Sequence, residues 1–131
     1  MALERIPSDS RYAPIIGFSR AVRAGDLVFL AGISAIDADG VAVGGDDPYL
    51  QARECLAKMT AALEAAGADV HDVVHTRMFL VDAAHWQDVG RAHGEVFADA
   101  RPAATMVVVK ELLDPRMLVE IEAIAISPSD A

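Results

Sequence analysis

The segment from Pro48 to Ala66 carries the clearest structural signal in the chain. Asp46 and Asp47 precede it as candidate helix caps, Pro48 suits a first helical turn, and Gly67 follows as a stop. Its apolar side chains recur at helical spacing and predict one helix with a single buried stripe. The stripe consists of Leu50, Cys55, Leu56, Met59 and Leu63. A helix with one apolar face has to pack against a second layer, which the flanking segments must supply.

Those flanking segments alternate with the period of two that is typical of strands. A short strand near Glu4–Ile6 is followed by a hairpin, Phe18–Val22 and Leu27–Ile33, with Gly25-Asp26 as its turn. The rest of the first eighteen residues is rich in turn formers and predicts an irregular lead-in. Asp37–Asp47 holds several glycines and aspartates and predicts a loop.

The second half of the chain adds three strands and a second helix. Val73–Val81 is a strand in which Val74, Thr76, Met78 and Leu80 share one face. Asp82 caps a helix from about Ala84 to Phe97, whose predicted buried stripe consists of Trp86, Val89, His93, Val96 and Phe97. The two closing strands are Thr105–Val109 and Leu118–Ile126, separated by Asp114-Pro115.

This order of elements predicts one α+β domain over residues 1–131, with a mixed sheet and two helices on one face. Two helices cover only one side of a sheet. The other side would carry apolar side chains with nothing to cover them: Phe79, Val81, Val107, Val109 and either Ile124 or Ala125. Self-association is the natural way to bury such a face.

Composition excludes several classes of protein. The 131 residues are the length of one domain, and 53% hydrophobic residues are enough for a packed core. A formal charge of −9 disfavours nucleic-acid partners. The single cysteine, Cys55, lies on the apolar helical stripe and predicts a packed thiol in a reducing cytoplasm. No apolar run approaches the roughly 20 residues of a membrane span, and no signal segment is recognisable.

Two carboxylates stand out in the last strand. Glu120 and Glu122 lie two residues apart, so strand alternation sends both to the face of Leu118 and Ile124. Carboxylates among aliphatic side chains either pair with arginines or have raised pKa values suited to proton transfer. The pattern alone leaves both readings open.

Other familiar arrangements of catalytic or ligating residues give little support for a particular function. The four histidines, among them His93, have no spacing suited to metal ligands in the predicted elements, so no metal is expected. Nucleotide-binding and serine-nucleophile motifs are missing, so no cofactor is expected either. Arg101 precedes a strand and can present its guanidinium to a carboxylate at the rim of the sheet, with Arg20 and Arg77 as rivals. A solvated or paired arginine is the alternative for each.

The ordered set of segments resembles the Rid superfamily, the reactive intermediate deaminases also called the YjgF or L-PSP family. The resemblance is carried by Ile16-Gly17, by 28–32 (VFLAG), by Gln51-Ala52-Arg53, by 65–68 (AAGA) and by Asp72-Val73-Val74. It is most specific at Arg101-Pro102-Ala103 followed by 118–125 (LVEIEAIA). The resemblance implies a chorismate-mutase-like fold and a homotrimer whose sheets form a central barrel, with ligand clefts between subunits. It also implies hydrolysis of reactive imines or enamines without metal or cofactor.

When the site residues of the family are transferred one by one to this sequence, some are kept and others are replaced. The water-handling glutamate of the family falls on Glu120, and the glycine that lines its cleft falls on Gly32. The arginine that binds the substrate carboxylate is replaced by Ala104, a cysteine by Met106, and an aromatic hydroxyl by Ser19. Losing a desolvated contact between an arginine and a carboxylate costs about 2–5 kcal/mol. Ordinary imino-acid deamination is therefore in doubt.

The substitutes for that arginine are Arg101 and, second, Arg20, or the ligand lacks a carboxylate. His93 either lines the cleft or is satisfied by core neighbours. Three functions compete: a Rid-like hydrolase with Glu120 activating water, a trimer that binds a small molecule without turnover, and an endoribonuclease or translation inhibitor. The acidic charge disfavours the third, and the sequence does not name the substrate.

Overall fold

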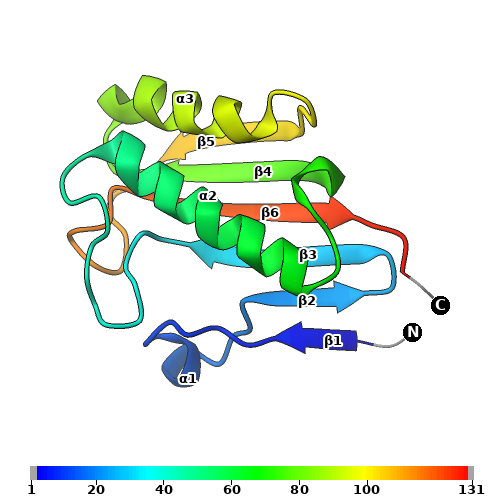
Figure 1. Cartoon of the computed structure of the whole chain (residues 1–131). Helices are drawn as coiled ribbons and strands as arrows, with labels where there is room; N and C mark the ends of the chain where they lie inside the picture. The colour runs from blue at the N-terminus through cyan, green and yellow to red at the C-terminus, as the bar shows by residue number, and fades with distance from the viewer. Residues whose placement is uncertain (1–2, 130–131) are drawn as a thin grey trace.

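The computed structural model describes residues 3–129 and consists of one sheet with the two long helices on one face and a short helix beyond its first strand (Figure 1). The strand order is β1-β2-β3-β6-β4-β5, and all neighbours are antiparallel except the parallel pair β4 and β5. The strands are β1 (Leu3–Ile6), β2 (Ala21–Ala24), β3 (Leu27–Ile33), β4 (Val73–Leu80), β5 (Ala103–Val108) and β6 (Val119–Ile126). The helices are α1 (Ala13–Ile16), α2 (Pro48–Ala65) and α3 (Trp86–Phe97), with single 3-10 turns at Val70–Asp72 and Ala83–His85.

The predicted α+β fold, with a mixed sheet and two helices on one face, is confirmed. Helix α2 begins where its cap predicted, because the Asp47 side chain accepts hydrogen bonds from the backbone N–H groups of Tyr49 and Leu50. It ends before Gly67, whose φ of 82° is the left-handed conformation of a helix stop. In the described residues, no helix is long and apolar enough to cross a membrane.

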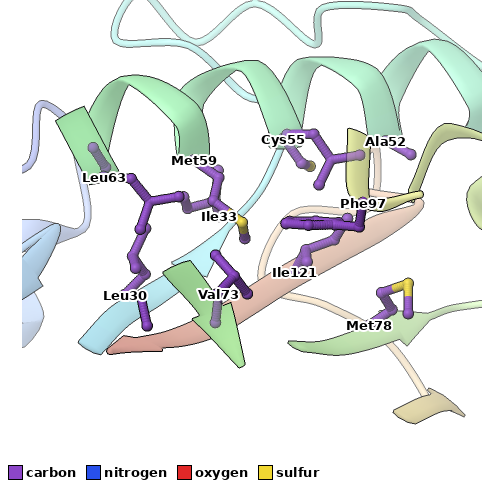
Figure 2. Packing of buried hydrophobic residues seen from close by; sticks show 14 of the residues in the cluster. Leu30, Ile33, Ala52, Cys55, Met59, Leu63, Val73, Met78, Phe97 and Ile121 are labelled. Atoms are coloured by element: carbon purple, nitrogen blue, oxygen red, sulfur yellow. The ribbon is translucent and has the colours of Figure 1, made fainter. Parts of the chain in front are cut away.

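The core lies between α2, α3 and the covered face of the sheet (Figure 2). Met59 and Leu63 of α2 pack against Leu30, Ile33 and Ile121 of the central strands. Burying each such side chain contributes about 1.5–3 kcal/mol, so this layer supplies much of the folding free energy. Cys55 is buried in the same layer, and burial raises the pKa of its thiol to about 12. The thiol is therefore an unreactive part of the core, as the sequence predicted.

Several details differ from the sequence prediction. Val74 is exposed, and Val73 takes its place in the core because the register of β4 against β6 shifts between Val73 and His75. Leu50 and Trp86 are also exposed, because each stands in the first turn of its helix, outside the packed face. The lead-in contains the short helix α1, which the sequence reading missed.

The face of the sheet opposite the helices is uncovered in the single chain. Phe29 of β3 is 42% exposed and lies opposite Ile124 of β6, while Phe79 of β4 lies opposite Val107 of β5, which is 40% exposed. Of the two alternatives at this strand end, Ile124 lies on the open face and Ala125 is buried under the helices. The apolar open face expected from the sequence is therefore present.

Candidate functional site

A cavity of about 210 Å³ lies where β3 ends and β6 begins. The lead-in around α1 and the segment before β6 form its other walls. The pairing of β3 with β6 shifts register between Leu30 and Ile33, next to the cavity, and such irregularities often re-aim side chains at sites. The cavity is lined by Ser10, Tyr12, Ile16, Phe18, Ala31, Gly32, Ser34, Leu113, Met117 and Glu120.

The carboxylate of Glu120 lies directly over the backbone of Gly32. A methyl group at position 32 would collide with Oε1 of Glu120 and stand 2.9 Å from its Cδ. Position 32 can hold only glycine without moving this carboxylate. The structure therefore brings together Glu120 and Gly32, as the sequence reading paired them, in one cavity wall.

The surroundings of Glu120 favour its protonated form. Burial raises the pKa of the Glu120 carboxyl, and the nearby negative charge of Glu122 raises it further. The positive charge of Arg20 opposes both effects but is the weakest of the three. A carboxyl group with a raised pKa is a better base than a solvent-exposed one, so it is suited to exchange protons with water or a ligand.

Glu122 differs from Glu120 although both lie on the open face. Its Oε1 pairs with Nη2 of Arg77 on β4 at 2.8 Å, and it does not line the cavity. The sequence left open whether these glutamates pair with arginines or have raised pKa values, and each interpretation applies to one of them. Glu122 is the glutamate matched to an arginine, and Glu120 is the one with the raised pKa.

Arg20 is buried near Glu120 but does not line the cavity. Its Nη2 lies 3.7 Å from Oδ1 of Asp9, and burial lowers the pKa of its guanidinium. Ser19 is half-buried between Arg20 and Phe18, and it is Phe18 that lines the cavity. On α2, Lys58 donates from Nζ to the carbonyl oxygens of Ser34 at 2.7 Å and Ile36 at 3.0 Å, which fixes the chain beyond Gly32.

Ala104 and Met106 lie elsewhere in the same chain. On β5 they stand opposite Thr76 and Met78, the inward-facing residues of β4, so they face the helical layer. The residue of β4 opposite Glu120 is Phe79, three positions beyond Thr76 and about 10 Å further along the strand. One chain therefore does not bring position 104 to the cavity of Glu120.

Arg101 and His93 also stand apart from the cavity. Arg101 is exposed in the turn after α3, with a φ of 46°, and its Nε donates to the carbonyl of Ala98 at 3.1 Å. Nε2 of His93 on α3 lies 2.8 Å from the hydroxyl of Thr76, and its ring packs on Phe97 at 4.7 Å. Burial lowers the pKa of His93. In this chain His93 is satisfied by core neighbours.

The sequence reading missed most of the apolar wall. Tyr12, Phe18 and Leu113 line the cavity from irregular segments, where no periodicity marks which way a side chain points. In the sequence these segments show large apolar residues beside turn formers, such as Ile16 and Phe18 on either side of Gly17. Within residues 3–129, no group of three or more His, Cys, Asp or Glu side chains is placed to hold a metal ion.

Comparison with known proteins places this geometry in a family. The family model described as Endoribonuclease L-PSP matches residues 8–127. A RutC family protein of Pyrococcus horikoshii is 34% identical over 123 residues, which cover 93% of this chain and 96% of that protein. The chain belongs to the YjgF/Rid family. An uncharacterized Streptomyces coelicolor protein is 37% identical, over 92% of this chain and 90% of its own length.

Solved structures of the YjgF/Rid family agree with the fold. A Mycobacterium tuberculosis member of the YjgF/YER057c/UK114 family has a TM-score of 0.86 at 39% identity, covering 95% of this chain and 99% of that one. A Thermotoga maritima protein titled a putative endoribonuclease also has a TM-score of 0.86, at 31% identity, covering 98% and 100%. The names of these YjgF/Rid proteins differ widely, so activity has to be argued from the site.

Proposed function

We propose that the chain hydrolyses a small reactive imine or enamine in the cavity at Glu120, without metal or cofactor. One observation carries the proposal: a carboxylate with a raised pKa stands over Gly32 in the wall of an apolar cavity. Such a group can hold a water molecule and remove its proton. The resemblance to the reactive intermediate deaminases, together with the family match over residues 8–127, supports the same reaction.

The chemistry needs little from the protein. Water adds to the carbon of the protonated C=N bond while Glu120 takes one of its protons, which forms a neutral carbinolamine. The proton then passes from Glu120 to the nitrogen, the C–N bond breaks as the hydroxyl proton goes to the leaving ammonia, and a carbonyl compound and ammonium leave. General base catalysis of this kind accelerates a reaction by about 10²–10⁴-fold.

We further propose that the working unit is a homotrimer. The open sheet face with Phe29, Phe79, Val107 and Ile124 has no cover within one chain. Position 104 cannot reach the cavity of its own chain, so its side chain can adjoin Glu120 only from another copy. Both features are accounted for if copies pack sheet to sheet with clefts between them, the arrangement that the resemblance implies.

The test is an imine-hydrolysis assay with two sources of imine. An L-amino-acid oxidase and a primary-amine oxidase, each with catalase, generate imines in the presence of semicarbazide, which traps what is not hydrolysed. We expect the wild-type protein to lower semicarbazone formation from at least one source, and Glu120→Gln to lose this effect. Glu64→Gln, which removes an exposed carboxylate from α2, is the matched control and should keep it.

Equal semicarbazone formation with and without protein, for every imine tried, would overturn the proposal. Saturable binding without hydrolysis would then identify a binding trimer instead. A nuclease has less support, because the chain carries a formal charge of −9 and Arg20, whose positive charge acts on Glu120, is paired with Asp9.

A further inference from the structure

The cavity at Glu120 is built for an apolar ligand. Large apolar or aromatic side chains form its walls, from the lead-in by Tyr12, Ile16 and Phe18 and from the segment before β6 by Leu113 and Met117. Among the lining residues that the structure describes, Glu120 is the one charged side chain. A ligand therefore meets mainly hydrocarbon, together with the hydroxyl-bearing residues Ser10, Tyr12 and Ser34 and one carboxyl group.

Two cations near this cavity, Arg20 and Arg116, are already engaged, and the exposed Arg11, between Ser10 and Tyr12, does not line it. Arg20 is buried and pairs with Asp9 at 3.7 Å. Arg116 binds both oxygens of Asp114, from Nε at 3.0 Å and Nη2 at 2.8 Å, and donates from Nη1 to the carbonyl of Gly40 at 2.8 Å. Neither guanidinium lines the cavity. A ligand carboxylate would have to displace a protein carboxylate to reach either one.

A second copy of the chain would add no charge from its edge strand. Residues 103–109 read AATMVVV and contain no ionisable side chain. Arg101, just before this strand, is held by its own turn, because its backbone N–H donates to Phe97 at 2.9 Å and its Nε to Ala98. An edge strand of this composition placed against the cavity would extend the apolar wall.

We infer that the substrate is an imine of an apolar aldehyde or ketone of about one-ring size, without a carboxylate. This inference rests on the proposed hydrolysis and names the substrate class of the same site. In the single chain the volume of about 210 Å³ exceeds the roughly 150 Å³ that accommodates benzene in an engineered cavity, so a ring-sized group fits this part of the site. In its ionised form Glu120 attracts the protonated iminium, whereas it repels a carboxylate in the same place.

The reaction balances without another reactant. The iminium R–CH=NH₂⁺ and one water give the aldehyde R–CHO and ammonium. The new C–O bond comes from water, the C–N bond breaks, and no electron is transferred. Glu120 accepts a proton from water in the first step and returns it to nitrogen in the second, so the protein ends as it began.

Two imines that differ only by a carboxylate provide the test. Monoamine oxidase makes the imine of phenylacetaldehyde from phenethylamine, and L-amino-acid oxidase makes the imine of phenylpyruvate from phenylalanine. We expect the protein to hydrolyse the first at least tenfold faster than the second, as measured by loss of semicarbazone. Faster or equal hydrolysis of the phenylalanine-derived imine would overturn the substrate class and leave the proposed hydrolysis standing.

Binding of two stable ketones separates the two proposals. Calorimetric titration should show that phenylacetone binds at least tenfold more tightly than phenylpyruvate, which carries a carboxylate where phenylacetone has a methyl group. This preference without turnover of any imine would overturn the hydrolysis and support the ligand class. Tighter binding of phenylpyruvate, or no binding of either ketone, would overturn the ligand class.

A variant that adds a cation to the cavity gives an independent readout. Leu113 lines the cavity and is 66% exposed, so Leu113→Arg should fold and place a guanidinium at the entrance. We expect it to tighten phenylpyruvate binding at least fivefold and to leave phenylacetone binding within twofold of that of Leu113→Gln, the uncharged control. Unchanged phenylpyruvate binding would contradict the inference that the missing cation excludes carboxylates.

Discussion

Gly32→Ala should separate catalysis from folding, because the atoms closest to the added methyl group belong to one flexible side chain. The atoms nearest to a Cβ at position 32 all belong to Glu120: Oε1, Cδ at 2.9 Å and Cγ at 3.2 Å. These atoms are the end of a flexible side chain, so the carboxylate can swing away while the backbone of β3 stays in place. A displacement of about 1 Å at a reacting group can lower a rate by about 10²-fold.

The cost to stability should be small. Moving the Glu120 side chain off its preferred rotamer costs about 0.5–1.5 kcal/mol. Gly32 has no positive φ, so alanine fits its backbone and gains about 0.4–1 kcal/mol by restricting the unfolded chain. These effects nearly cancel, and we expect the free energy of unfolding to change by less than about 1 kcal/mol, which is a shift in Tm of about 4 °C.

The assay compares imine hydrolysis and thermal unfolding in Gly32→Ala, Glu120→Gln and the double variant. If Gly32 acts only by making room for the carboxylate, the double variant should be no slower than Glu120→Gln alone. Wild-type kcat in Gly32→Ala would refute the reasoning, since the carboxylate would then work from another position. A large loss of stability would refute it too, because the added methyl group would have to clash with backbone.

Three further predictions test other parts of the molecule. Because the pKa of Glu120 is raised in the folded state, its protonated form stabilises the fold, and this contribution is lost as pH rises through the folded-state pKa. Glu120→Gln, which is uncharged at every pH, should therefore unfold at a higher temperature than wild type at neutral pH. A lower Tm would contradict the raised pKa. Gln51→Ala should lower the free energy of unfolding, measured in urea, by about 3 kcal/mol, because the buried amide donates to the carbonyls of Gly45 and Arg116 and accepts from the N–H of Leu118. A loss below about 1 kcal/mol would show that water replaces the amide. Phe29→Lys, on the open face, should give monomers in light scattering. Trp86→Lys changes an exposed apolar side chain on the helical layer and should leave the trimer intact. Trimers in both variants would contradict burial of the open face.

The parts of the fold that the sequence predicted are those governed by local rules. Asp47, Pro48 and Gly67 bound α2 through capping and backbone preferences that act within a few residues. The exposed position of Val74 could not be predicted in this way, because it depends on a register shift against β6, a strand almost fifty residues away in the chain. A slip of one residue exchanges the two faces of a strand, and only pairing between distant segments decides it.

The candidate site divides along the same line. The alternating pattern marked Glu120 and Glu122 equally, and the family resemblance singled out Glu120. Phe18 and Leu113 come from irregular segments that only the folded chain brings together. The role of Arg20 was equally hidden, since its partner Asp9 lies in the lead-in. What sequence supplied was the chemical group, and what folding supplied was its environment.

The two faces of β6 explain why the closing segment of the chain is its most specific signature. Val119, Ile121 and Ala123 point into the core beneath the helices, while Glu120 and Glu122 point to the open face. One face of β6 therefore contributes side chains to the core, and the other face carries the candidate catalytic carboxylate. A polar residue at Ile121 should unfold the domain, whereas glutamine at Glu120 should leave it folded and inactive, so the two halves of one motif can fail independently.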